Sequence, residues 1–205
     1  MSAFENPKDR WNQRFDTPLF VFGEHANAYL VAKQHLLPIG HLLAVADGEG
    51  RNSVHLARAG WRVDAFDFSD VAIAKARQHA VHHGVEVAFT CTDCAQFDWG
   101  INRYDGVVGI FFQFADPDER AAIFKQIDTC LTPGGVVLIQ GYGTGQLGFN
   151  TGGPGRLEHL YTEDLLVSAF EGYEVLDRCT YEAELAEGAG HAGRSALVGF
   201  VARKP

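Results

Sequence analysis

Several classes of protein are disfavoured by what this sequence has little of. Its four cysteines are too few for a disulfide-stabilised scaffold, and no apolar run approaches the roughly 20 residues of a membrane span. Basic residues number 17 against 26 acidic ones, and the net charge of −9 disfavours contact with a nucleic-acid backbone. The first residues lack the basic start and apolar core of a signal peptide. We therefore expect a cytoplasmic monomer or weak homodimer with no nucleic-acid or membrane partner.

The composition is that of one folded domain. With 205 residues, 46% hydrophobic and 21% charged, the chain is long enough for one substantial core and too short for a second catalytic domain. We divide this single domain, 1–205, into an aromatic N-terminal lid and helix (1–40), a cofactor-binding core (41–140) and a C-terminal part (141–205). The C-terminal part holds a glycine-rich substrate loop, a helix and a closing hairpin.

Apolar runs alternate with helical patterns, which is typical of repeated βα units. Strands are predicted at 41–46, 61–66, 85–90, 106–112 and 136–140, and an antiparallel pair at 173–185 and 194–202. Helices are predicted at about 26–37, 50–59, 69–84, 116–131 and 162–170. The helix after Asp116 is the clearest, because Asp116, Pro117 and Glu119 form a capping box with a first-turn proline. We predict an α/β fold, a Rossmann-like doubly wound sheet of five parallel strands plus the antiparallel hairpin, with helices on both faces.

A glycine loop follows the first predicted strand. Gly48 and Gly50 lie where the strand passes into a helix, and Asp67 ends the next strand, placed to bind the two hydroxyls of a ribose. This combination predicts an adenosine-containing ligand. The carboxylates of Asp47 and Glu49 would repel the pyrophosphate of a nicotinamide dinucleotide but suit the cationic S-adenosylmethionine. An NAD-dependent oxidoreductase and a non-catalytic S-adenosylmethionine-binding protein remain the alternatives.

The ends of the third and fourth strands also face this cleft. Asp93 is placed to bind an adenine amino group, with the backbone of Cys94 and Ala95 beside it, although a turn-capping acid would look the same. Phe111 lies at the end of the fourth strand.

At this point the sequence resembles a known family, the small class I methyltransferases similar to tellurite-resistance and, more distantly, thiopurine methyltransferases. The resemblance rests on the segments WNQRF (11–15), FG (22–23), GEGRNS (48–53), DFS (67–69), LTPGG (131–135) and NTGGP (150–154). Ala46 departs from the family, since a glycine is usual there. The resemblance implies an S-adenosylmethionine-dependent enzyme whose cofactor set comprises Trp11, Phe22, Asp47, Gly48, Gly50, Asn52, Asp67, Phe68, Asp93, Cys94, Ala95 and Phe111.

The methyl acceptor is expected over the carboxyl ends of the strands. Tyr142 and His191 are the candidate catalytic residues, and His191 has acids nearby that could tune it as a base. Candidate acceptor contacts are Gln113, Asn150, Arg156, His159 and Tyr161, each of which could equally be a solvated loop side chain. The resemblance suggests a small acceptor such as tellurite, selenite or a thiol.

Two further patterns are interpreted as structural. Cys91 and Cys94 have the spacing of a redox motif, but no helix pattern opens there. His79, His82 and His83 share a helical face, and a polar helix end explains them without a metal. No metal is predicted.

Overall fold

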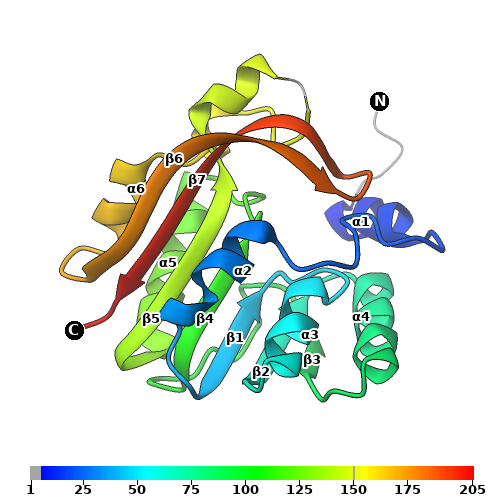
Figure 1. The fold of residues 1–205 in the computed structure, drawn as a ribbon, viewed down its shortest axis with the longest axis horizontal. Coiled ribbons are helices and arrows are strands. Elements are labelled where there is room, and N and C mark those ends of the chain that lie inside the picture. The colour runs from blue at the N-terminus through cyan, green and yellow to red at the C-terminus, as the bar shows by residue number, and fades with distance from the viewer. Residues whose placement is uncertain (1–5, 150) are drawn as a thin grey trace.

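The computed structural model describes residues 6–149 and 151–205, and its centre is one sheet of seven strands (Figure 1). The strand order is β3-β2-β1-β4-β5-β7-β6. Neighbours among β1 to β5 pair in parallel, whereas β7 runs antiparallel to both β5 and β6. The strands are β1 (His41–Val45), β2 (Arg62–Asp67), β3 (Ala88–Cys91), β4 (Tyr104–Ile110), β5 (Leu131–Tyr142), β6 (Glu174–Glu187) and β7 (His191–Arg203). The predicted fold class is confirmed.

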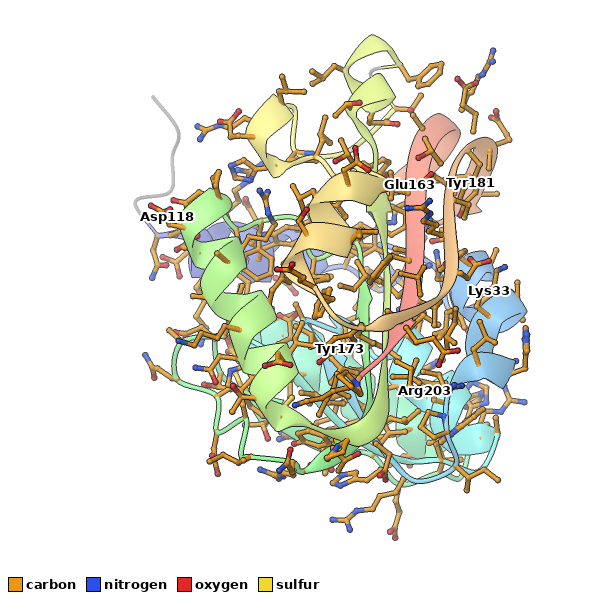
Figure 2. All side chains as sticks on the ribbon, turned by 90° about the vertical axis from the view of Figure 1, so that its left-hand side faces the viewer. Lys33, Asp118, Glu163, Tyr173, Tyr181 and Arg203 are labelled. Carbon is orange, nitrogen blue, oxygen red and sulfur yellow. The ribbon has the colours of Figure 1, made fainter. Side chains whose placement is uncertain are left out.

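Helices cover both faces of the sheet. Figure 1 shows α2 and α3 in front of the strands and α5 behind them, and Figure 2 shows α5 and α6 on the side opposite α2. The helices are α1 (Pro7–Phe15), α2 (Ala28–Lys33), α3 (Arg51–Arg58), α4 (Asp70–His82), α5 (Pro117–Cys130) and α6 (Glu163–Ala169), with short 3₁₀ turns η1 (Gln34–Leu36), η2 (Thr144–Gly148) and η3 (Leu157–His159). Among the described residues, no helix is both long and apolar enough to cross a membrane.

The double cover explains why the strands are apolar on both sides. Along β1, Leu43 and Val45 pack into the core shared with α5, while Leu42 and Ala44 pack into the core beneath α2 and α3. Buried parallel strands therefore appear as continuous apolar runs and not as alternating ones.

The helix α5 confirms the capping prediction. The Asp116 side chain accepts hydrogen bonds from the backbone N–H groups of Asp118 and Glu119, and the Glu119 side chain accepts one from the Asp116 N–H. Ile123 and Ile127 then face the core.

The helix α1 was not predicted. Asn6 caps it by accepting a hydrogen bond from the Lys8 N–H, and Pro7 occupies its first turn. Its aromatic residues, Trp11 and Phe15, have helical spacing, but one such pair is too short a repeat to reveal a helix. The contacts of Asn12 with Ser69 and Asp70, at 2.6 and 2.7 Å, hold α1 against the start of α4.

The terminal hairpin is longer than predicted. β6 and β7 extend to Glu187 and His191, which brings their tip beside the segment before α2. There the Gly190 N–H donates to the Val21 carbonyl at 2.9 Å. Figure 1 shows this tip next to α1.

Candidate active site

The bend between β1 and α3 is built from left-handed backbone. Ala46, Gly48 and Gly50 have φ values of 48°, 60° and 84°. A Cβ on Gly50 would lie 2.8 Å from the Cβ of Ala76, so only glycine allows α3 and α4 to pack this closely. Ala46 occupies the usual glycine position at a cost of about 1 kcal/mol or more in backbone strain.

Asp67 points into this bend. One of its carboxylate oxygens accepts a hydrogen bond from the Gly48 N–H at 3.0 Å, and the other accepts one from the Ser69 N–H at 2.9 Å. The residue is only 6% exposed. Burial raises its pKa, while these backbone N–H groups favour the ionised form. The carboxylate is thus held at the edge of the glycine loop, with lone pairs left for a ligand.

Asp47 is the second carboxyl of the bend. Its carboxylate accepts a hydrogen bond from the Ser53 hydroxyl. Burial, together with the nearby Asp67 charge, raises the pKa of Asp47 to about 7 despite that hydrogen bond. The bend therefore holds one carboxyl that titrates near neutrality, which favours a cationic group over an anionic one.

Glu49 does not face this ligand space, and the expectation that it contributes charge there is wrong. It is 3% exposed, forms an ion pair with Lys75 and accepts a hydrogen bond from the Val21 N–H at 2.8 Å. Lys75 also donates to three backbone carbonyls between Phe15 and Leu19. This pair anchors the segment after α1 to α4.

The loop after β3 shows the turn-capping arrangement. Asp93 is exposed, and one of its carboxylate oxygens accepts hydrogen bonds from the N–H groups of Ala95 and Gln96 at 2.9 and 2.8 Å. The Cys94 carbonyl accepts one from the Trp99 indole at 3.0 Å, and burial raises the pKa of the Cys94 thiol to about 12. A redox role is disfavoured, because a thiol with this pKa is not a nucleophile near neutrality.

Aromatic side chains gather above the bend from distant parts of the chain. A Cβ added at Gly48 would lie 3.6 Å from the Phe15 ring, and Phe22 lies 6.0 Å from Phe15 between ring centroids. Trp11 stacks on Phe15 at 5.6 Å. The guanidinium of Arg14 lies 5.0 Å from the rings of Trp11 and Phe22, within cation–π range. Trp11 and Phe22 thus belong to one aromatic cluster with Phe15, and their role at the cofactor stays a prediction.

A comparison with protein-family models matches the segment of the chain that contains this bend. Residues 42–135, which include the bend and Asp67, match the model of a methyltransferase domain. Residues 42–135 form a methyltransferase domain. The predicted cofactor, S-adenosylmethionine, is thereby confirmed for the family, and the nicotinamide alternative loses its support.

Individual known proteins are also similar to this chain, in sequence or in structure. Over 120 residues the chain is 30% identical to the carboxy-S-adenosyl-L-methionine synthase of Aeromonas salmonicida, a match covering 58% of this chain and 48% of that protein. The chain thus spans about half the length of the curated relatives it matches. TehB from Haemophilus influenzae has a TM-score of 0.70 at 20% identity, covering 97% of this chain and 67% of that one. A structure from work on the conversion of a disulfide into a thioacetal in echinomycin biosynthesis has a TM-score of 0.74 at 20% identity, covering 95% and 88%. Both structures share the fold.

Three rings surround His191, one of the two predicted catalytic residues. The His191 ring centroid lies 4.1 Å from Phe111, 4.4 Å from Phe22 and 5.7 Å from Tyr142. Phe111 has a φ of 54°, a strained value for a bulky residue and typical of functional sites. The Tyr142 hydroxyl is buried and has no hydrogen-bond partner among the described residues, and burial raises its pKa to about 12.

Charged groups beneath His191 set its protonation. Burial lowers the pKa of His191, the cations of Arg51 and Arg14 act in the same direction, and Glu187 opposes them. The Arg51 guanidinium lies 2.8 Å from a carboxylate oxygen of Glu187 and donates to the Phe22 carbonyl at 2.9 Å. Although burial opposes it, His191 and Arg51 lower the pKa of Glu187 to about 2. His191 is therefore neutral and Glu187 ionised near pH 7.

The other predicted acceptor residues have mostly structural surroundings, although Gln113 and His159 are in direct contact. The Gln113 amide is used to hold backbone, donating to the carbonyls of Tyr142 and His159 at 2.9 and 3.0 Å. Tyr161 packs with Phe112 and Phe124 in the core, so its predicted place in the acceptor site is wrong. Both ring nitrogens of the buried His159 lack a partner among the described residues. Arg156 is exposed, and Asn150 lies outside the described residues.

Asn52, predicted at the cofactor, instead holds the chain before α2. Its side-chain oxygen accepts a hydrogen bond from the Asn27 N–H at 3.0 Å. The Asn27 amide donates to Gln140 and Glu187 at 3.1 and 2.9 Å. The cofactor role of Asn52 was predicted from its position beside Arg51, directly after the glycine loop. Its observed partner, Asn27, lies more than 20 residues away in the sequence, so no local pattern reveals this contact. Phe68, also predicted at the cofactor, is half-buried directly after Asp67.

Proposed function

We propose that the chain is an S-adenosylmethionine-dependent methyltransferase acting on a small soft nucleophile, a thiol or a metalloid oxyanion such as tellurite or selenite. The observation that supports the proposal best is the Asp67 carboxylate, held by two backbone N–H groups at the glycine bend of a methyltransferase domain. A ribose at this edge would complete its hydrogen bonding.

The residues present fit this cofactor. Asp67 would hold the ribose hydroxyls, and Asp47, with its pKa of about 7, would pair with the ammonium of the methionine part. Phe22 and Phe111 both lie beside His191, at 4.4 and 4.1 Å between ring centroids, and an aromatic ring favours a sulfonium cation. The cluster also excludes water, which strengthens electrostatic contacts in the site.

The reaction needs little covalent chemistry from the protein. When bound, S-adenosylmethionine would supply an activated methyl group whose carbon the lone pair of an acceptor attacks in line, with the electrons of the broken carbon–sulfur bond remaining on the sulfur. The protein aligns the acceptor and handles its proton. His191, neutral near pH 7, accepts the proton of a thiol, and the protonated Tyr142 hydroxyl donates a hydrogen bond to the acceptor.

Calorimetry and product analysis test this function. The protein should bind S-adenosylmethionine and S-adenosylhomocysteine and not NADH, and mass spectrometry should detect methylated product from a panel of thiols, selenite and tellurite. Amines and alcohols of similar size serve as matched acceptors that should react poorly. Binding of the cofactor without methylation of any acceptor would favour the non-catalytic alternative.

The curated relatives support a second candidate. They are named as synthases of carboxy-S-adenosylmethionine, and identity over 58% of this chain reaches 30%. In that case S-adenosylmethionine would be the substrate and would leave carboxylated. The same mass spectra distinguish the two functions, since one yields S-adenosylhomocysteine and the other a nucleoside carrying an added carboxyl group.

A further inference from the structure

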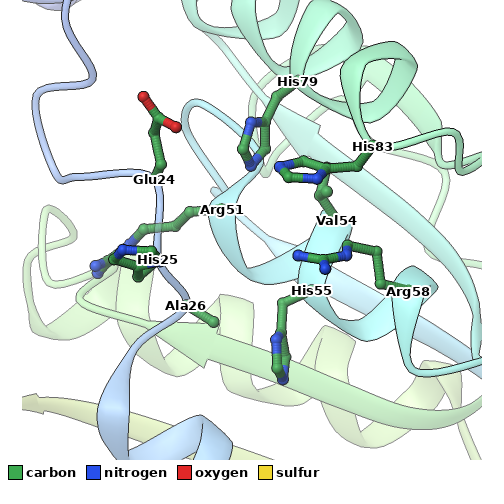
Figure 3. Close-up of a pocket in the computed structure, with 9 residues that line it drawn as sticks. All are labelled: Glu24, His25, Ala26, Arg51, Val54, His55, Arg58, His79 and His83. Atoms are coloured by element: carbon green, nitrogen blue, oxygen red, sulfur yellow. The ribbon is translucent and has the colours of Figure 1, made fainter.

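A cavity lies apart from the glycine bend. It has a volume of about 130 Å³ and lies between α3, the end of α4 and the segment before α2 (Figure 3). Its lining is rich in basic and imidazole groups and includes one acid: Glu24, His25, Ala26, Arg51, Val54, His55, Arg58, His79 and His83. None of the bend residues lines it.

Two of the side chains that line the cavity already have partners within the protein. Arg51 is paired with Glu187, and His55 is within 2.9 Å of the side-chain oxygen of Gln34. The exposed Arg58 forms no ion pair or side-chain hydrogen bond in the described part of the chain. Figure 3 shows its guanidinium on the same side of the cavity as the rings of His79 and His83.

Those two rings meet edge to face, with centroids 4.6 Å apart. The His79 ring also contacts Phe20, at 5.0 Å. The cavity is thus a built space with one free guanidinium and two adjacent imidazoles, and its volume is about ten times the roughly 10–15 Å³ that one water requires.

A metal is the less suitable occupant. No group of three metal-ligating side chains occurs within residues 6–149 and 151–205. Arg51 and Arg58 also contribute two guanidiniums to the wall, and these disfavour a cation.

We propose that this cavity is a binding site for a small divalent oxyanion of the phosphate or sulfate type, held by Arg58, His79 and His83. The site is separate from the methyltransferase chemistry. Guanidinium and protonated imidazole are the side-chain donors best suited to such an anion.

Binding should take up protons. Burial lowers the pKa of His79, and His83, His82 and Arg58 add to this effect, while Glu24 opposes it. Burial and Arg58 likewise lower the pKa of His55. Near pH 7 these imidazoles are neutral, so an anion that binds beside them favours their protonation and binds more tightly as the pH falls. Glu24, the one acid in the lining, works against the anion.

Sulfate is the suitable probe, because it keeps both charges across the relevant pH range, so any pH dependence comes from the protein. Histidine ring NMR signals should be followed during sulfate titrations at about pH 6 and about pH 8, with sodium chloride of equal ionic strength as the control. We expect saturable shifts of the His79 and His83 signals, with a Kd about tenfold lower at the acidic pH. His191 should not shift.

Variants locate the site. Arg58→Ala should weaken sulfate binding at least fivefold, whereas Arg62→Ala, which removes another exposed arginine outside the cavity, should leave it unchanged. Glu24→Gln should strengthen binding. Shifts that chloride reproduces, shifts confined to His191, or equal effects of the two arginine variants would each overturn the proposal, and tighter binding of zinc than of sulfate would assign the cavity to a metal.

Discussion

Replacing Asp67 tests the cofactor site most directly. In the proposed complex, its carboxylate accepts hydrogen bonds from two ribose hydroxyls while two backbone N–H groups hold it in place. Each hydrogen bond to a charged group contributes about 1.5–3 kcal/mol, so Asp67→Ala should weaken S-adenosylhomocysteine binding by about 3 kcal/mol or more. At about 1.4 kcal/mol per tenfold, the loss exceeds about a hundredfold.

Loss of the carboxylate also disturbs the bend, so affinity alone is not decisive. Removing it leaves the buried N–H groups of Gly48 and Ser69 unpaired, which costs roughly 1–3 kcal/mol each in stability. Asp67→Asn does not avoid this, because its NH₂ group must face one of the two N–H donors. A ligand-side change is therefore needed.

Calorimetry with S-adenosylhomocysteine and its analogue lacking both ribose hydroxyls supplies that change. In the wild type the analogue should bind about a hundredfold more weakly, and in Asp67→Ala the two ligands should bind almost equally, which is the result of a double-mutant cycle for a direct contact. Asp105→Asn is the control, since that carboxylate also holds a backbone N–H, that of His41, at 2.8 Å, and lies away from the bend. If the analogue still binds about a hundredfold more weakly than S-adenosylhomocysteine in Asp67→Ala, Asp67 does not contact the ribose.

The remaining predictions concern neighbouring positions. Ala46→Gly should relieve the left-handed strain at φ 48° and raise the free energy of unfolding in urea by about 1 kcal/mol, and a loss of stability would contradict the strain. Asp47 has a folded pKa of about 7, raised above its ordinary value of 3.8, so its contribution to stability is complete below about pH 3.8 and is lost as the pH rises through about 7. Asp47→Asn should therefore be more stable than wild type at about pH 8, as thermal unfolding would show. Because ionised Asp47 should pair with the ammonium, wild-type binding of S-adenosylmethionine should tighten between about pH 6 and 8, and Asp47→Asn should lack this tightening. The same pH profile in the variant as in the wild type would exclude Asp47 as the partner of the ammonium. Tyr142→Phe removes a hydroxyl without a described partner, so stability should change by less than about 1 kcal/mol while kcat falls about tenfold or more; unchanged turnover would assign Tyr142 to packing alone.

The sequence predicts the glycine bend and the acid beside it well because their signals are local. The glycines at 48 and 50 and the acid at 67 belong to consecutive elements, and parallel pairing of β1 with β2 brings them together, with Val45 beside Phe66. The capping box before α5 is equally local. In each case, neighbouring residues determine the backbone conformation that the structure shows.

The roles of Glu49 and Tyr161 could not be predicted in this way. Glu49 belongs to the glycine loop by position, yet its partners Lys75 and Val21 come from α4 and from the N-terminal segment. Tyr161 follows a glycine-rich loop, but its ring packs among Phe112 and Phe124. A polar or aromatic residue type at a loop position does not reveal which long-range partner it finds.

The contrast between local signals and long-range contacts also applies to the cofactor side and the acceptor side of the proposed site. The cofactor side comes from one βαβ unit, whereas the acceptor side joins Phe22 from before α2, Phe111 from the end of β4 and His191 from the terminal hairpin. The ion pair of Arg51 with Glu187 and the bond from Gly190 to Val21 hold these distant segments together over the bend. Substitutions in either the N-terminal segment or the hairpin tip can therefore rearrange the rings around His191 without touching Asp67, so this fold can keep one cofactor site while its acceptor changes. It follows that the family match over residues 42–135 covers the bend and Asp67 but, of these three acceptor-side residues, only Phe111, so the acceptor is best sought through Phe22 and His191, which lie outside that range.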